Sequence, residues 1–377
     1  MTRTFRFRGA ALAATLALTG VAAAAAGPAG AKGSGYTATT IATGLNNPRG
    51  ITMGPDDRLY VAEAGLGSGN AATGVQPGLG NTGSITVVRK PAHEYFNSKR
   101  IVTGLPSAAM DEGNGPEAIG PAGLYAGGDS GNVKLRAVVG AAGIPNSLYG
   151  HAIGVRVSDR KVYDIADVGS SNLAWTAQYQ GQPWAGADFP DSNPYGINPM
   201  HGVRYVVDAG SNTLNRINKD GTIDVLAYFP GTGISDAVPT CVTEGPDGAL
   251  YIGTLALADF FVKGPGTATV YRVDVKKTDP DSLDRILSVA KPWATGFSTI
   301  TGCTFDDDDN FYAAEMFTGD VAKVPFKNPT ARTLIGQGTL TLPNGVAVSE
   351  SGKVYVTNLS STQQAGAGSV VRFVRNK

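Results

Sequence analysis

A strand-like segment built around a tyrosine recurs six times along this chain, and this repeat constrains the fold more than any other feature. The six tyrosines are Tyr60, Tyr125, Tyr205, Tyr251, Tyr312 and Tyr355. Four copies share one register, in which a tripeptide lies 12 to 10 positions before the tyrosine: Pro48-Arg49-Gly50, Pro239-Thr240-Cys241, Ile300-Thr301-Gly302 and Pro343-Asn344-Gly345. Alternating apolar residues and a turn such as 54–57 follow each tripeptide. Each copy is therefore predicted to form a strand, a tight turn and a second strand.

Two copies are less regular than the other four. Pro194-Tyr195-Gly196 lies one residue closer to its tyrosine, and Pro116-Glu117 lies three residues closer. Six imperfect β repeats at intervals of 43 to 80 residues indicate a ring or array of small sheets rather than a sandwich. We therefore predict an all-β chain that folds as a six-bladed β-propeller.

The strand pattern assigns residues to six blades. The first blade is predicted at 50–53, 59–63, 84–89 and 100–103, and the second at 115–119, 124–127, 154–158 and 162–166 with a helix inserted over 132–142. The third lies within 193–229, the fourth includes 268–275 and 285–289, the fifth includes 321–324 and 332–335, and the sixth ends with 369–374. The sixth blade lacks a fourth strand, and the β segment 36–43 belongs to no blade. We expect these two segments to pair and close the ring.

Residues 1–31 are predicted to be a signal peptide, and residues 32–377 to form the propeller. Three arginines lie among the first eight residues, 10–26 is almost continuously apolar, and Ala29-Gly30-Ala31 is the small-residue pattern of a cleavage site. Every later apolar run is a short strand broken by Gly or Pro, so no membrane span is expected after cleavage. The chain is predicted to be secreted or otherwise extracytoplasmic.

The charge of the chain gives no electrostatic signature of a partner. There are 31 basic and 31 acidic residues, and the formal net charge is zero. Such a chain offers no strongly basic surface for nucleic acid or for an anionic membrane, so neither is expected as a partner. We expect a monomer.

The two cysteines occupy nearly the same place in neighbouring repeats. Cys241 lies 10 residues before Tyr251, and Cys303 lies 9 residues before Tyr312, so a propeller places their strands side by side. The oxidising environment outside the cytoplasm favours a disulfide between them. The offset of one residue could instead direct the two side chains to opposite strand faces and leave two buried thiols. A disulfide is the preferred interpretation.

Two positions of the repeat are predicted to lie at one level, at the mouth of the central channel: the residue after the repeat proline and the residue three positions after the tyrosine. The candidate ligand-binding residues at these positions are Arg49, Glu63, Glu117, Tyr195, Asp208, Glu315, Asn344 and Asn358. Carboxylates gathered there repel one another unless a cation, an arginine or water lies between them. The sequence leaves two interpretations open: a ligand or cation site, or side chains that cap strand ends and bind neighbouring blades.

No nucleophile can be aligned with a base, so no catalytic residue is predicted. His93, His151 and His201 lie in or beside loops, and they do not recur with the cysteines at metal-ligand spacing. The acidic run 306–309 aligns with the Pro-Asp-Gly turns of other copies and lacks the spacing of a calcium loop, so it is interpreted as a turn. No cofactor is predicted, and calcium at the channel mouth is kept as an alternative.

Two insertions, 66–82 and 170–191, make one face of the predicted ring rich in loops. Trp175, Tyr179, Trp184 and Phe189 lie in the second insertion. These aromatic side chains either form a platform for a sugar or flat ligand, or cover the edge of a sheet, and covering the edge is the preferred interpretation.

Several segments carry a resemblance to a known family. They are Asp191-Ser192-Asn193-Pro194-Tyr195-Gly196 with 207–212, and Val238-Pro239-Thr240 with 244–253. These segments resemble the ScyD/ScyE family of exported proteins, within the superfamily of NHL-like and gluconolactonase-like six-bladed propellers, and the similarity covers nearly all of 32–377. The resemblance implies the fold and export but no agreed reaction or catalytic set. The segment 254–257 departs from the family, because relatives tend to carry an acidic residue there.

Two functions of different classes follow. The first is a non-enzymatic binding or scaffold protein that recognises a small molecule, glycan or protein on its loop-rich face. The alternative is a calcium-dependent lactonase or esterase of the gluconolactonase type, which needs oxygen ligands where this chain has Arg49, Thr240 and Thr301. A quinone-dependent sugar dehydrogenase would need a histidine at the mouth, and none is placed there. The binding protein is therefore favoured.

Overall fold

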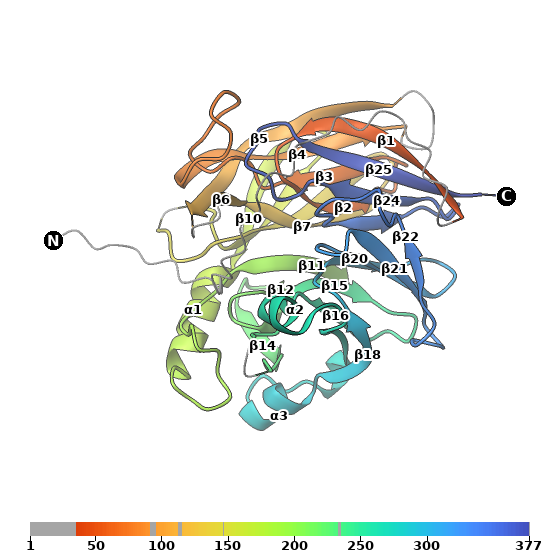
Figure 1. The fold of residues 1–377 in the computed structure, drawn as a ribbon. Helices are drawn as coiled ribbons and strands as arrows, with labels where there is room; N and C mark the ends of the chain where they lie inside the picture. Colours follow the sequence, from red (N-terminus) through yellow and green to blue (C-terminus); the bar gives the residue numbers. More distant parts are fainter. Residues whose placement is uncertain (1–34, 91–95, 112–114, 146, 233–234, 377) are drawn as a thin grey trace.

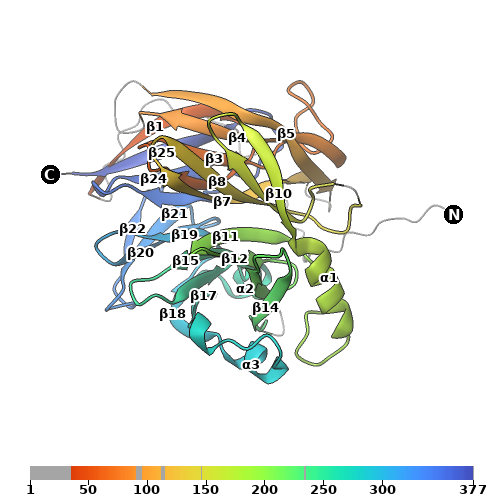
Figure 2. The same cartoon turned by 180° about the vertical axis from the view of Figure 1, so that it is seen from behind.

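The computed structural model describes residues 35–90, 96–111, 115–145, 147–232 and 235–376. The predicted signal peptide and His93 lie outside these residues. The described chain is almost entirely β and forms six antiparallel sheets of four or five strands, shown from opposite sides in Figures 1 and 2. This arrangement is consistent with a six-bladed β-propeller.

Each sheet is built from strands that are consecutive in the sequence, with one exception at the N-terminus. The first sheet contains β2 (Pro48–Met53), β3 (Leu59–Glu63), β4 (Gly78–Arg89), β5 (Asn97–Asp111) and β6 (Pro116–Ile119). The second contains β7 (Pro121–Asp129), β8 (Asn132–Val139), β9 (His151–Arg156) and β10 (Lys161–Asp167). The third contains β11 (Pro194–Met200), β12 (Val203–Asp208), β13 (Thr213–Ile217) and β14 (Ile223–Tyr228).

The remaining three sheets follow the same order. The fourth contains β15 (Pro239–Glu244), β16 (Leu250–Thr254), β17 (Ala268–Val273) and β18 (Lys291–Phe297). The fifth contains β19 (Ile300–Phe305), β20 (Asn310–Glu315), β21 (Asp320–Pro325) and β22 (Thr333–Ile335). The sixth contains β23 (Val346–Val348), β24 (Val354–Asn358), β25 (Gly368–Arg375) and β1 (Tyr36–Leu45).

The first strand of each sheet contacts the first strand of the next. These contacts join β2 to β7, β7 to β11, β11 to β15, β15 to β19, β19 to β23, and β23 back to β2. Six inner strands therefore surround one axis. We use the term mouth face for the end of the sheets at which these inner strands begin.

The N-terminal strand β1 completes the last sheet. It pairs antiparallel with β25, from Tyr36 opposite Arg375 to Leu45 opposite Gly368, and both strands lie side by side in Figures 1 and 2. The expected pairing of 36–43 with 369–374 is therefore present. It covers what would otherwise be an open sheet edge.

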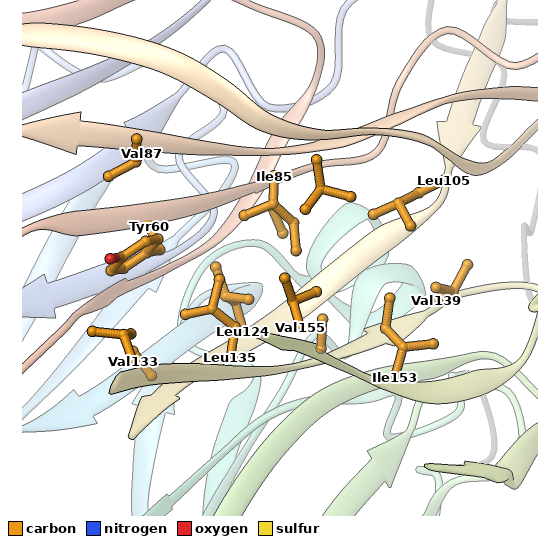
Figure 3. Packing of buried hydrophobic residues seen from close by; sticks show 14 of the residues in the cluster. Tyr60, Ile85, Val87, Leu105, Leu124, Val133, Leu135, Val139, Ile153 and Val155 are labelled. Carbon is orange, nitrogen blue, oxygen red and sulfur yellow. The ribbon is translucent and has the colours of Figure 1, made fainter. Parts of the chain in front are cut away.

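Apolar side chains of neighbouring sheets pack face to face. Figure 3 shows this packing between the first two sheets, where Tyr60 and Ile85 lie against Leu124, Leu135 and neighbouring residues. Tyr60, Ile85 and Leu135 have no exposed surface. Burying one such side chain stabilises the fold by about 1.5–3 kcal/mol, so the repeat tyrosine is mainly a core residue.

The tyrosine hydroxyl also fixes the turn that precedes it. Tyr60 donates a hydrogen bond to Asp56 over 2.8 Å, and Tyr312 donates one to Asp306 over 2.9 Å. Asp306 further accepts from the backbone N–H of Asn310. The acidic run 306–309 is thus a turn, as the sequence predicted, and its first carboxylate is engaged in hydrogen bonds.

The second copy of the repeat was aligned incorrectly by the sequence analysis. The structure places Tyr125 in the inner strand β7, where Pro121-Ala122-Gly123 lies beside the tripeptides of the other inner strands. Pro116 and Glu117 belong to β6, which pairs with β5 as the fifth strand of the first sheet. The later Pro-x-Gly match was overlooked because only one residue separates it from the tyrosine.

Two further strand assignments were wrong. The segment 132–139 is strand β8 and not a helix, because Val133, Leu135 and Ala137 alternate with Lys134 and Arg136 and pack inward. The segment around 285–289 is mostly the helix α3 (Leu283–Ser288), capped by Ser282, and β18 is the outer strand of the fourth sheet.

In the described residues, helices lie in connections between strands. The helix α1 (Val168–Gln178) begins the insertion before β11, α2 (Leu257–Lys263) joins β16 to β17, and the short 3₁₀ turn Val275–Lys277 precedes α3. In the described part of the chain, none of these helices has the length and apolar character needed to cross a membrane.

The aromatic insertion packs against the edge of the third sheet. The ring centroids of Trp184 and Tyr228 on β14 are 5.1 Å apart, and those of Trp175 and Tyr179 are 4.9 Å apart. Phe189 is buried in the same cluster. These contacts match the prediction that the insertion covers a sheet edge rather than presenting an open platform.

Candidate ligand-binding site at the channel mouth

A β-bulge near the start of several inner strands directs one side chain toward the channel. In the third sheet Pro194 pairs with Asp208 and Gly196 with Val207, so Tyr195 is the extra residue. Thr240 and Thr301 are skipped in the same way. A β-bulge changes the direction of the side chain of the extra residue. Here the extra residue leaves the regular alternation of side chains along the inner strand.

Arg49 is the central charged group of the mouth. Its side chain is 7% exposed, and its guanidinium donates to Glu117 Oε1 over 2.9 Å, to the Ala118 carbonyl over 2.8 Å and to the Tyr195 hydroxyl over 3.0 Å. Burial acts to lower the pKa of Arg49, but Tyr195 and Glu117 outweigh it and the pKa is raised. The mouth therefore holds a permanent positive charge.

Tyr195 links sheets on opposite sides of the axis. Its hydroxyl accepts from Arg49 of the first sheet and, over 2.7 Å, from the Asn344 amide beside the sixth sheet. Asn344 is itself buried. We call Arg49, Glu117, Tyr195 and Asn344 the mouth residues, because together they form one hydrogen-bonded network over the channel.

The channel beneath these residues is narrow. Its cavity has a volume of about 60 Å³ and is lined by inner-strand residues such as Gly123, Gly196 and Cys241. A Cβ atom at Gly123 would lie only 2.6 Å from the Tyr195 carbonyl oxygen, so glycine is needed for the close approach of these strands. A volume of this size holds a few waters, and a larger ligand must lie above the mouth.

The two cysteines join neighbouring inner strands. Cys241 of β15 and Cys303 of β19 form a disulfide, with their Cα atoms 5.7 Å apart. The predicted offset does not prevent this bond, because the two strands belong to different sheets and share no pleat. The bond ties the fourth sheet to the fifth beside the channel.

Four other predicted residues have a different role. Glu63, Asp208, Glu315 and Asn358 each accept a hydrogen bond from the backbone N–H of the loop that leads into the inner strand of the same sheet; the donors are Asn46, Asn193, Ser298 and Thr341. We call these four the bracing residues. The structure thus divides the eight predicted residues into two sets of four.

Glu63 is compensated by a cation. Its carboxylate has no exposed surface and accepts from Thr86 over 2.6 Å and from Arg100 over 2.6 Å. Charge-assisted hydrogen bonds of this kind satisfy a buried carboxylate. Sequence reasoning missed Arg100, because a partner on another strand leaves no signal in the repeat.

Asp208 is satisfied without a cation. It accepts from the Asn172 amide over 2.8 Å, the Ser192 hydroxyl over 2.6 Å and three backbone N–H groups, of Asn193, Gly210 and Ser211. Burial and the Asp208 charge raise the pKa of the adjacent Asp191 to about 7. The Asp-Ser-Asn segment therefore braces the start of β11 through hydrogen bonds to Asp208.

Glu315 lies opposite a second carboxyl group. It pairs with Asp320 at the end of the β20–β21 hairpin, and both residues are 3% exposed. Burial raises the pKa of Glu315 to about 8, with Asp320 acting in the same direction, and Arg332 opposes the shift. The pair thus holds one proton near neutral pH, because the free-energy cost of ionising two adjacent buried carboxyl groups is high.

The described residues at the mouth do not provide the ligand set of a divalent cation. Among the described residues no group of three or more His, Cys, Asp or Glu could hold a metal ion. The bracing carboxylates are bonded to N–H and O–H donors, and Thr240 and Thr301 donate to backbone carbonyls of neighbouring strands. The positive charge of Arg49 lies at the mouth, so calcium does not fit there.

An exposed aromatic cluster on the mouth face was missed by the sequence analysis. Phe260, Phe261 and Val262 lie on α2, and Phe317 lies on the β20–β21 turn, 5.2 Å from Phe261 between ring centroids. Val262 is 64% exposed. We call these four residues the aromatic patch. Three consecutive large apolar residues in a loop bounded by glycine were the signal.

Comparisons with known proteins identify the fold. No family model and no curated protein matches the chain. A putative oxidoreductase described as a glucose dehydrogenase from Thermus thermophilus is 14% identical with a TM-score of 0.53, over 90% of this chain and 100% of that one. A gluconolactonase from Xanthomonas campestris is 9% identical with a TM-score of 0.53, over 90% and 89%.

A third solved structure has the same fold. The calcium-binding protein regucalcin from Agrobacterium tumefaciens is 12% identical with a TM-score of 0.52, over 91% of this chain and 96% of that one. At such identities the likeness shows the fold alone. The comparisons therefore show that the chain has a β-propeller fold.

Proposed function

We propose that this chain is an exported six-bladed β-propeller of the ScyD/ScyE type, closed by the pairing of β1 with β25, which acts as a non-enzymatic binding protein. Its ligand, a small molecule, glycan or protein, lies on the mouth face. The long connections 64–77, 168–193 and 255–267 rise on this face, because they follow strands that run toward it. Loops on a rigid scaffold are common positions for binding residues.

One observation carries the proposal: the buried guanidinium of Arg49 occupies the channel mouth. A metal-dependent hydrolase needs an open cation site among oxygen ligands. Here a fixed positive charge lies at that place and is tied to Glu117 and Tyr195. This network suits recognition of a polar ligand better than activation of water.

The aromatic patch supports binding over the same face. Phe261 is 39% exposed and Phe317 is 36% exposed, and they contact one another across two sheets. Clusters of exposed aromatic side chains are enriched at recognition surfaces. The patch and the mouth network therefore offer an apolar and a polar anchor on one face.

The alternative function is a calcium-dependent lactonase or esterase. It is favoured by the fold shared with the Xanthomonas gluconolactonase and the calcium-binding regucalcin. It is opposed by the chemistry of the mouth, where Arg49, Thr240 and Thr301 stand in place of anionic ligands. The binding protein is the better account of these residues.

The test is a screen of the secreted protein, fluorescently labelled, on an array of glycans and peptides. We expect at least one ligand whose binding falls tenfold or more in a Phe261→Ser, Val262→Ser, Phe317→Ser variant. The matched control is Phe96→Ser, because Phe96 is also 36% exposed but lies beside the β4–β5 hairpin at the opposite end of the sheets.

A parallel assay separates the two functions. The protein should not hydrolyse lactones or aryl esters in 1 mM calcium above the rate of a heat-denatured sample. Calcium-dependent hydrolysis that is lost in an Asp208→Asn variant of intact fold would overturn the binding-protein proposal in favour of the alternative.

A further inference from the structure

The ion pair at the mouth joins two very unequal partners. The side chain of Arg49 is 7% exposed, whereas that of Glu117 is 57% exposed. Glu117 lies on β6, and the first sheet is the one sheet of the described chain with a fifth strand. The buried cation is therefore held rigidly, while its anionic partner is reached by solvent and can be exchanged for another anion.

Arg49 keeps its position through contacts other than Glu117. The guanidinium also donates to the Ala118 carbonyl and the Tyr195 hydroxyl, over 2.8 and 3.0 Å. Removal of the Glu117 carboxylate therefore leaves the guanidinium held in place by these contacts but without an anionic partner. Arginine recognises planar carboxylates through its paired N–H groups.

Tyr195 provides a second donor beside this cation. Its oxygen accepts from Arg49 and from Asn344, which uses both lone pairs. Among the described residues no acceptor for its own O–H is found, and the nearby hydroxyls of Thr240 and Thr301 donate to backbone carbonyls. A two-oxygen anion above the mouth could accept from both Arg49 and Tyr195.

We propose that the mouth is a binding site for the carboxylate of a ligand, and that Glu117 occupies the place of this carboxylate in the ligand-free protein. This inference rests on the proposed function, because it names the ligand class of the same face. The carboxylate belongs either to a small organic acid or to the C-terminus of a peptide, and the experiment distinguishes these sources.

Competition with Glu117 fixes the direction of the expected effect. When a site is available for only a fraction of the time, its apparent Kd is the intrinsic Kd divided by that fraction, and is therefore larger. Glu117→Gln keeps an oxygen acceptor for Arg49 but removes the competing charge. Carboxylate affinity should therefore rise in this variant.

The experiment is isothermal titration calorimetry at constant ionic strength with sodium gluconate and with trialanine. Neutral controls are glucose and trialanine amide. We expect the preferred carboxylate to bind Glu117→Gln at least tenfold more tightly than the wild-type protein, and the neutral controls not to bind. The matched charge control is Asp159→Asn, since Asp159 is paired with Arg156 in an exposed ion pair, and it should behave as wild type.

Two further variants test the donors in the Glu117→Gln background. Tyr195→Phe should lose about tenfold in carboxylate affinity, and Arg49→Met should abolish binding. Tyr195→Phe decides the matter if Arg49→Met does not fold. Equal carboxylate affinity in wild type and Glu117→Gln, or affinity that Tyr195→Phe leaves unchanged, would overturn the inference.

The outcomes also separate this inference from the proposed function. If array ligands bind the mouth face while neither carboxylate binds Glu117→Gln, the carboxylate site is wrong and the binding protein stands. If the protein hydrolyses lactones with calcium and no ligand is lost on changing the aromatic patch, both proposals fall.

Discussion

The bracing residues and the mouth residues lie at the same end of the sheets, yet they form hydrogen bonds with different kinds of partner. Each bracing residue binds the backbone of its own sheet, as Glu63 binds Asn46 and Asn358 binds Thr341. The mouth residues instead bind one another across the axis, as Asn344 binds Tyr195. The two positions of the repeat therefore have different roles: the residue after the repeat proline joins the network of the mouth, and the residue three positions after the tyrosine binds the backbone of its own sheet.

This difference has an energetic consequence. A buried polar group that loses its partners costs far more than an exposed one, because it cannot return to water. The bracing carboxylates have many buried donors, whereas Glu117 is more than half exposed. Changes to the bracing residues should therefore lower stability, whereas a change to the exposed Glu117 should mainly alter binding.

The largest effect is expected for Asp208→Asn. The amide places an N–H₂ group among five buried donors, so we expect the free energy of unfolding to fall by about 4 kcal/mol. Chemical denaturation measures this loss. Asp281→Asn on an exposed turn is the control and should change stability by less than about 0.5 kcal/mol. If the free energy of unfolding falls no more in Asp208→Asn than in Asp281→Asn, the distinction between bracing and mouth residues is wrong.

The next effect is expected for Arg100→Met. This change leaves the fully buried Glu63 without its cation, and we expect a loss of about 3 kcal/mol at pH 7. Arg156→Met removes an exposed ion pair and should cost less than about 1 kcal/mol. Similar losses in both variants would contradict the assignment of Glu63.

A pH-dependent effect is expected at Glu315. Its pKa is raised from 4.5 to about 8 in the folded chain, so the folded protein retains a proton that the unfolded chain releases. Its contribution to stability is present below pH 4.5 and is lost as pH rises toward 8. We expect the stability of the wild-type protein to fall between pH 5 and pH 8.5, and this fall to be smaller in Glu315→Gln, measured by denaturation at the two pH values. If stability changes with pH in the same way in wild type and in Glu315→Gln, Glu315 and Asp320 share no proton.

The smallest change in stability is expected for Tyr195→Phe. The hydroxyl bridges two donors at a site that solvent reaches, so we expect a loss of about 1 kcal/mol or less. Thermal and chemical denaturation of Tyr195→Phe and Asp208→Asn under the same conditions measure this loss. A loss equal to that of Asp208→Asn would mean that the mouth network also serves mainly to hold the fold.

Much of this fold could be predicted because its repeats have a fixed local pattern. The alternating apolar residues located the third sheet, and the missing fourth strand of the sixth blade indicated the pairing of the terminal strands. The second repeat failed because Pro116-Glu117 imitates the tripeptide that Pro121-Ala122-Gly123 actually provides. The strand β8 failed because an insertion was assumed where the alternation of Val133 and Leu135 already indicated a strand.

The site was predictable as a set of residues but not as a set of contacts. The repeat register located Arg49, Tyr195 and Asn344 at the mouth. It could not reveal the bulge that separates Tyr195 from Asp208, because a bulge depends on the pairing of two strands. Nor could it reveal that Arg100 compensates Glu63, since this contact joins residues on different strands.

Thermal unfolding of the EDTA-treated protein with and without 1 mM calcium tests the central claim most directly. A ligand bound only by the folded state stabilises it by about 2.7 kcal/mol at 100 times its Kd. Since Arg49 lies at the mouth and the bracing carboxylates are bound to donors, the account predicts a midpoint unchanged to within about 1 °C. A rise of several degrees that is lost in Glu63→Gln, Asp208→Asn and Glu315→Gln variants of intact fold would contradict it.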